Sequence, residues 1–279
     1  MPTGSLQITP ASEHVGAFVE GVDLRDVDDD LLARLHQAWA RYGVLFFRDQ
    51  QLSETDHIAF AERFAPIDIN KFFAAVPDYP QIAQVLKEAD QITNIGGGWH
   101  TDHSYDQIPA KGSILLARET PRTGGDTLFL SVGAAFESLS DGLKDALRSL
   151  RAHHSNEHVF GAGGAQVDGD VGDRIGNPEA TGGAIHPVVI RHPDTGRELL
   201  YVNAAFTTHF EGWTVEESKP LLDFLYQHIA TGPFAYQFTW SPDSVAMWDN
   251  RSTWHWALND YHGHRRLMHR ITIQGEPIS

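Results

Sequence analysis

Short stretches in which apolar and polar residues alternate recur along most of the chain, and this pattern limits the possible folds more than any other feature. Phe234, Tyr236, Phe238 and Trp240 occupy alternate positions, which is the period of a β-strand. Further strands are predicted over residues 44–47, 112–118, 126–130, 185–191, 199–203, 245–248 and 265–274. Because these strands do not alternate regularly with helices, we predict a mainly β, α+β fold: an antiparallel sandwich or jelly roll with appended helices.

Four helices are predicted between the strands. The first covers residues 29 to 43 and ends at a glycine, and the second begins after Ser53, which has a capping acid three residues later. A continuous apolar stripe predicts a third helix over residues 133 to 151. The fourth begins at Thr214, where a Thr-x-x-Glu pattern forms a capping box.

The chain contains neither an internal repeat nor a clear linker, so we predict a single domain over residues 1–279. Residues 161 to 183 contain eight glycines and no periodic apolar pattern. A segment of this length inside a domain is either functional or disordered. We predict a lid over residues 155–184, with plain disorder as the alternative.

Composition excludes several classes of protein. The chain has 37 acidic and 21 basic residues, a formal charge of −16, which argues against a nucleic-acid partner. It has no cysteine, and therefore no disulfide, thiolate metal site or cysteine nucleophile. Its apolar runs are far shorter than the roughly 18 residues of a membrane span, and its N-terminus lacks the features of a signal peptide. We expect a cytoplasmic protein without a membrane partner.

One short motif suggests a metal site. In an extended segment the side chains of His100-Thr101-Asp102 place an imidazole and a carboxylate on the same side, and two histidines with one carboxylate are the ligand set of many non-haem iron oxygenases. With 16 histidines in the chain, chance alone predicts about one such pair. A second pair, His192-Pro193-Asp194, precedes Thr195-Gly196 and is better explained as a hairpin corner. A candidate third ligand is His255.

The predicted strand over residues 265–274 places two arginines on one face. Its alternation puts Arg266 and Arg270 on the same side and His269 on the other. Guanidinium groups suit bidentate capture of a carboxylate or sulfonate. Structural ion pairs with the many acidic residues of the chain explain the two arginines equally well.

Taken together, the motifs closely resemble the taurine/2,4-D dioxygenase family, and the resemblance covers nearly the whole chain. It rests on Trp99-His100-Thr101-Asp102, Thr123-Gly124-Gly125-Asp126-Thr127, Trp248-Asp249-Asn250-Arg251 with His255, and Arg265-Arg266 through Met268-His269-Arg270. Members of this family use Fe(II) and 2-oxoglutarate on a double-stranded β-helix. The resemblance therefore implies the jelly-roll form of the predicted fold.

The resemblance also implies roles for individual residues. The implied iron ligands are His100, Asp102 and His255. Arg266 would bind the distal carboxylate of 2-oxoglutarate with support from the Thr127 hydroxyl, and Trp248 would line the same pocket.

The substrate implied by the resemblance is a small anion. Asp68-Ile69-Asn70 stands where taurine-using members have His-x-His, which argues against taurine, and residues 154–161 are more similar to aryloxyalkanoate-cleaving members. We therefore expect a sulfonate, a sulfate ester, an aryloxyalkanoate or a similar carboxylate. The expected substrate contacts are Arg270, Asn70, His158 and Phe160.

The function implied is that of a dioxygenase that consumes O2 and 2-oxoglutarate, hydroxylates the substrate and releases succinate and CO2. Because relatives are commonly dimers or tetramers, we expect a homo-oligomer. Two alternatives are a zinc-dependent hydrolase built on the same three ligands and a non-catalytic jelly-roll protein that binds a small molecule. Arg266 and Thr127 at the family spacing argue against the hydrolase, and the intact ligand set argues against the binding protein.

Overall fold

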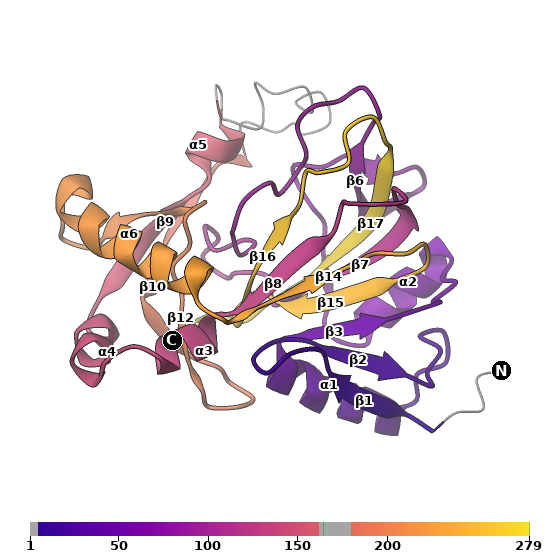
Figure 1. Cartoon of the computed structure of the whole chain (residues 1–279), viewed down its shortest axis with the longest axis horizontal. Coiled ribbons are helices and arrows are strands. Elements are labelled where there is room, and N and C mark those ends of the chain that lie inside the picture. Colours follow the sequence, from indigo (N-terminus) through magenta and orange to yellow (C-terminus); the bar gives the residue numbers. More distant parts are fainter. Residues whose placement is uncertain (1–4, 162–163, 165–179, 279) are drawn as a thin grey trace.

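A nine-stranded sheet forms the larger layer of the protein (Figure 1), whose computed structural model describes residues 5–161, 164 and 180–278. The strand order is β1-β2-β3-β15-β7-β17-β6-β5, and β4 also pairs with β17. Neighbouring strands are antiparallel except for the parallel pair β2 and β3. The bounds are β1 (Gln7–Pro10), β2 (Ala17–Glu20), β3 (Val44–Phe47), β15 (Val245–Asp249), β7 (Gly112–Glu119), β17 (Arg266–Ile273), β6 (Tyr79–Lys87), β5 (Ala75–Val76) and β4 (Ile67–Asp68).

A three-stranded antiparallel sheet packs against the larger one. It consists of β14 (Ala235–Phe238), β8 (Thr127–Ser131) and β16 (Thr253–Ala257), in that order. A buried apolar cluster joins the two sheets, and the rings of Phe46 and Phe238 stack within it at 4.3 Å between centroids. Two facing sheets with an apolar core between them are the sandwich arrangement, so the predicted jelly roll is confirmed.

Helices α1 (Asp29–Tyr42) and α2 (Glu54–Glu62) cover the outer face of the larger sheet. Helix α1 ends, as predicted, at Gly43, whose φ of 72° suits a residue without a Cβ. Ser53 and Asp56 form the reciprocal bonds of a capping box at the start of α2. Thr214 and Glu217 do the same for α6 (Val215–Thr231). Three of the four predicted helices are therefore confirmed.

The third predicted helix is wrong as a single element. The chain forms α3 (Val132–Glu137) and α4 (Asp141–Arg148) instead, and the break covers residues 138–140. Ser138 donates its hydroxyl hydrogen bond back to the carbonyl oxygen of Ala135, and Ser140 has the extended backbone of an N-cap. Serine side chains that compete for backbone groups favour such ends. The apolar stripe is continuous because both helices pack into one core.

A second correction concerns the strand predicted over residues 185–191, which is two strands. The chain leaves one sheet after β10 (Gly183–Pro187) and enters a hairpin at β11 (Val189–Arg191). Val188 lies between them, and its amide donates to the carbonyl of Leu150. The hairpin partner is β12 (Glu198–Leu200), so the predicted corner at residues 192–196 is confirmed.

The remaining elements form a smaller layer on the opposite side of the molecule from β1 and α2. Figure 1 shows α3, α4 and α6 grouped there with β9 and β10. The elements not yet given are β9 (Arg151–Ser155), β13 (Thr207–Phe210) and α5 (Glu157–Phe160). The lid predicted over residues 155–184 lies largely outside the described residues. No helix in the described ranges is long and apolar enough to cross a membrane.

Candidate metal centre

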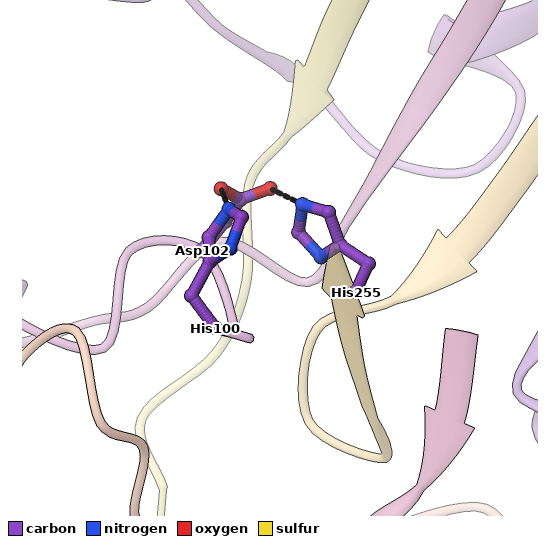
Figure 2. Close-up of side chains that lie close together, drawn as sticks. All are labelled: His100, Asp102 and His255. Atoms are coloured by element: carbon purple, nitrogen blue, oxygen red, sulfur yellow. Dashed lines mark ion pairs between the residues drawn. The ribbon is translucent and has the colours of Figure 1, made fainter. Parts of the chain in front are cut away.

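Two imidazoles and one carboxylate converge at the edge of the smaller sheet. His255 lies on β16, whereas His100 lies outside the named strands. Two backbone hydrogen bonds of 2.8 and 3.1 Å join the two residues. Figure 2 shows both rings directed at Asp102. The Nε2 atoms of His100 and His255 lie 3.7 Å from different oxygens of that carboxylate. These distances exceed hydrogen-bond length.

The hydrogen bonding of His100 fixes which of its nitrogens is free. Its Nδ1 donates to the carbonyl oxygen of Gly98 at 2.8 Å, and a carbonyl can only accept. The lone pair is therefore on Nε2, which faces Asp102, as in a metal ligand held by a second partner. Burial, and then the neighbouring His100, hold the pKa of His255 well below its usual range. The His255 ring is therefore neutral and can offer a lone pair to a metal ion.

The carboxylate of Asp102 is buried but charged. Burial alone raises its pKa, whereas the Arg270 guanidinium and then the His255 and His100 imidazoles lower it, and the result is a pKa below the usual range. The ligand atoms of the triad all lie within 4.8 Å of one another. Atoms that each lie about 2 Å from one ion must be this close together, so the three residues fit a single metal ion.

The turn between β15 and β16 positions the two segments that carry the three candidate ligands. The hydroxyl of Thr101 donates to the carbonyl oxygen of Asn250 in that turn. The turn is fixed by Asp249, which is fully buried and accepts from Arg251 (2.5 and 2.9 Å) and from His192 (3.1 Å). The network extends to the corner of the β11–β12 hairpin. The second His-x-Asp motif is therefore a structural support for the first.

A cavity of about 860 Å³ opens beside the triad. Most residues predicted from the sequence to bind a ligand line it. Besides the triad these are Asn70, Thr127, Phe160, Trp248, Arg266 and Arg270. The ring of Trp248 packs against that of His255, with 4.7 Å between centroids.

Arg266 is buried at one end of the cavity with a donor to spare. Its Nε donates to the carbonyl of Gly125 at 3.1 Å, while its Nη2 has no hydrogen-bond partner among the described residues. Burial lowers the pKa of this guanidinium from its usual value. Nearby, Trp240 donates to the hydroxyl of Thr127 at 2.9 Å, a contact that we did not predict. A buried cation with an unused N–H suits an incoming carboxylate.

Arg270 lies four residues along the same strand and also has a free donor. Its Nη2 is 3.3 Å from Asp102 and 3.4 Å from the hydroxyl of Thr272, and its Nε is buried without a hydrogen-bond partner in the described part of the chain. His269 faces the other way and accepts from Arg118 at 3.1 Å. The predicted division of the strand into two faces is confirmed.

Two predicted substrate contacts have other roles in this structure. His158 is exposed and does not line the cavity; its Nε2 donates to the carbonyl of Ala205 at 2.6 Å. Asn70 does line the cavity, but its Oδ1 accepts from the backbone amides of Phe72 and Phe73. Its side-chain oxygen is therefore used to shape the loop.

The sequence analysis missed several aromatic residues of the cavity wall: Trp256 on β16 and three residues in loops. The three loop residues are Phe73, Tyr105 and Phe206. None of these three lies in a regular element, so no helix or strand period indicates which way its side chain points. The resemblance quoted no motif at these positions.

Comparisons with known proteins agree with this geometry. Residues 7–272 match the model of the family described as "Taurine catabolism dioxygenase TauD, TfdA family". The chain belongs to this family.

Several relatives span almost the whole chain. The (S)-phenoxypropionate/alpha-ketoglutarate-dioxygenase of Sphingobium herbicidovorans is 32% identical and covers 99% of this chain and 97% of its own length. The alkylsulfatase of Acinetobacter baylyi is 32% identical over 99% of this chain and 87% of its own. Among solved structures, a taurine dioxygenase from Burkholderia xenovorans has a TM-score of 0.82 at 32% identity and covers 98% of this chain and 92% of its own.

A further solved structure, AAD-2 in complex with Mn(II) and N-oxalylglycine, has a TM-score of 0.81 at 28% identity and covers 98% of this chain and 99% of its own. With the family established, the protein is a 2-oxoglutarate-dependent dioxygenase, and its cofactors are Fe(II), 2-oxoglutarate and O2. The comparisons therefore favour a dioxygenase over the two alternatives, a zinc-dependent hydrolase and a non-catalytic binding protein.

Proposed function

We propose that His100, Asp102 and His255 bind Fe(II), that Arg266 binds 2-oxoglutarate, and that Arg270 holds a small organic anion for hydroxylation. The observation that carries the proposal is the pair of buried guanidinium groups on one face of β17, each with a donor that no described residue uses. One cation for each of two anions is what this reaction requires.

The residues of the triad fit the metal because each presents a free donor atom toward the same point. The hydrogen bond from Nδ1 of His100 to Gly98 directs the other ring nitrogen toward Asp102, and the lowered pKa of His255 keeps that ring neutral. A carboxylate and two imidazoles form the facial ligand set of non-haem iron oxygenases and leave other positions of the ion open. When bound, Fe(II) and 2-oxoglutarate activate O2, and the cosubstrate leaves as succinate and CO2.

The other cavity residues position the reactants and exclude water. Arg266 and the hydroxyl of Thr127, itself held by Trp240, form a polar end for the distal carboxylate of the cosubstrate. Trp248 covers the side of His255. Arg270 lies close to Asp102, so an anion bound to it lies near the reacting centre.

The class of substrate follows from the charge of Arg270 and from the relatives. Relatives bear the names of phenoxypropionate, sulfate ester, sulfonate and alkyl sulfate enzymes. We propose a sulfonate, a sulfate ester or an aryloxyalkanoate as the substrate. On the strength of the family resemblance, we also propose a cytoplasmic homo-oligomer, either a dimer or a tetramer.

An oxygen-consumption screen tests the function. Purified protein is supplied with Fe(II), 2-oxoglutarate and one member of each substrate class, and succinate is measured alongside O2. We expect succinate formation to require Fe(II), 2-oxoglutarate and O2, and to increase when the anion supplied is a substrate. Turnover of a test compound without 2-oxoglutarate or O2 would contradict the proposal, as would stimulation by zinc.

A further inference from the structure

Beyond the triad, the cavity wall is formed by aromatic rings. Tyr105, Phe160 and Phe206 come from three separate segments and all line the cavity. The rings of Tyr105 and Phe206 meet edge to face at 4.8 Å and 73°, and that of Phe160 lies within 6.4 Å of both. Aromatic side chains prefer such offset and edge contacts, and an added ring can join them in the same way.

This wall is close to the cation that would hold the substrate. The guanidinium carbon of Arg270 lies 5.8 Å from the ring centroid of Phe73, and Tyr105 is near enough to Arg270 for the charge of that arginine to affect the pKa of its hydroxyl. One molecule can therefore contact both Arg270 and the aromatic wall. At about 860 Å³ the cavity has the size of sites that bury drug-sized ligands, whereas 2-oxoglutarate and a two-carbon anion would fill only part of it.

The charges that face the cavity are unbalanced in a way that selects the substrate. Among its described lining residues the cations Arg266 and Arg270 are both present, but Asp102 is the only carboxylate. Asp68 and Asp106 lie near His103 but do not line the cavity. Among the described lining residues, an ammonium group on the substrate would have no carboxylate partner except the proposed metal ligand, and a buried unpaired charge is costly.

We propose that the substrate is a monoanion that carries an aromatic ring and no ammonium group. Its anionic group binds Arg270, and its ring packs against Tyr105, Phe160 and Phe206. The inference rests on the proposed function and deepens it, because it selects the aryl anions from the wider class and excludes zwitterions such as aminosulfonates.

Binding without turnover tests this inference. The full-length protein is loaded with Mn(II) and N-oxalylglycine, an unreactive analogue of 2-oxoglutarate, and titrated by calorimetry with matched anions. One pair is 2-phenoxypropionate and propionate, which differ by the aryloxy group. The other is ethanesulfonate and taurine, which differ by the ammonium group.

We expect 2-phenoxypropionate to bind about tenfold to a hundredfold more tightly than propionate, as burial of a phenyl ring predicts. Ethanesulfonate should bind at least tenfold more tightly than taurine. Equal affinities within either pair would overturn the inference while leaving the proposed function intact. Failure of N-oxalylglycine to bind would instead contradict the proposed function, so the two failures can be told apart.

A variant locates the effect in the wall. Phe206→Ala should reduce the affinity ratio of 2-phenoxypropionate to propionate to less than threefold. The matched control is Phe224→Ala on α6, whose ring is 48% exposed and does not line the cavity. If Phe206→Ala leaves the affinity ratio of 2-phenoxypropionate to propionate unchanged, the substrate's ring does not pack against this wall. The ligand pairs test the unmodified protein in any case, so the inference does not depend on the variant folding.

Discussion

Arg270 and His255 share one oxygen of a carboxylate: the Nη2 of Arg270 lies 3.3 Å, and the Nε2 of His255 3.7 Å, from Oδ2 of Asp102. Arg270, which is proposed to bind the substrate, therefore lies directly beside the proposed metal ligands. An anion bound to Arg270 competes with Asp102 for the same guanidinium. Substrate binding can thus alter the charge felt at the metal ligand without any movement of the backbone.

Removal of one imidazole should abolish the metal centre. We expect His255→Ala to lose at least a hundredfold in Fe(II) affinity and all detectable succinate formation, because two ligands remain where three are needed. Metal titration and the succinate assay measure the two effects. His262→Ala, at an exposed position outside the cavity, is the matched control, and full activity in His255→Ala would contradict the assignment of the ligand.

The two arginines should affect different Michaelis constants. Arg266→Ala should raise the KM for 2-oxoglutarate by roughly tenfold to a hundredfold, the effect of a lost charged hydrogen bond, with a smaller effect on the KM for the substrate. Arg270→Ala should show the reverse. Steady-state kinetics with each reactant varied in turn measures both, and equal effects of the two variants would refute the division of labour.

Stability should fall as the pH drops below about 6.5. Burial first, and then the charges of Arg118 and His269, lower the pKa of His57 from 6.5 to about 3. Burial also lowers the pKa of His154 to about 3. Between these pH values the unfolded chain binds protons that the folded protein does not, so each histidine reduces the free energy of unfolding by about 1.4 kcal/mol per pH unit.

Urea unfolding at pH 7.5, 6.5 and 5.5 measures this slope. His57→Leu removes one of these titrating groups and should make the slope below pH 6.5 less steep by about 1.4 kcal/mol per pH unit. The exposed variant His262→Leu should leave the slope unchanged. A slope in His57→Leu equal to that of the unmodified protein would show that His57 is already protonated in the folded state.

The buried network at Asp249 should be costly to break. Asp249→Asn removes the charge that pairs with Arg251 and His192, and the loss of one partner from a buried ion pair costs about 3–5 kcal/mol. Denaturant unfolding measures the loss. Asp223→Asn is the control, because Asp223 pairs with Lys219 at the exposed surface of α6, where such pairs contribute at most about 1 kcal/mol. A change below 1 kcal/mol in Asp249→Asn would contradict the structural role of the network.

The parts of the site that lie on regular elements could be predicted from the sequence. Alternation along β17 correctly separates Arg266 and Arg270 from His269, since a strand has a fixed period of two. By contrast, β16 was not predicted as a strand, so His255 was placed by its motif and not by its backbone. The break between α3 and α4 was missed because an apolar stripe continues across it, and only the bonds of Ser138 show where the first helix ends.

Of the aromatic wall, Phe160 was predicted, but Tyr105 and Phe206 could not be, for a different reason. Tyr105 and Phe206 lie outside regular elements and are distant in the sequence, and they meet only because the loops that carry them fold over the same cavity. No local periodicity encodes such a meeting. The same applies to the support of Asp249 by His192, which depends on a hairpin from another part of the fold.

The pairing of β17 with a neighbour on each side has a consequence for how this scaffold can diversify. Arg266 and Arg270 are four residues apart on a strand that pairs with β6 and β7, so their backbones are separated by about 13 Å. That spacing fixes the distance between the two proposed anion sites, because β17 cannot shift along either neighbouring strand without moving both arginines. New substrate preferences must therefore arise in the loops, and exchanging those loops between relatives should change the preferred anion while the geometry for 2-oxoglutarate is retained.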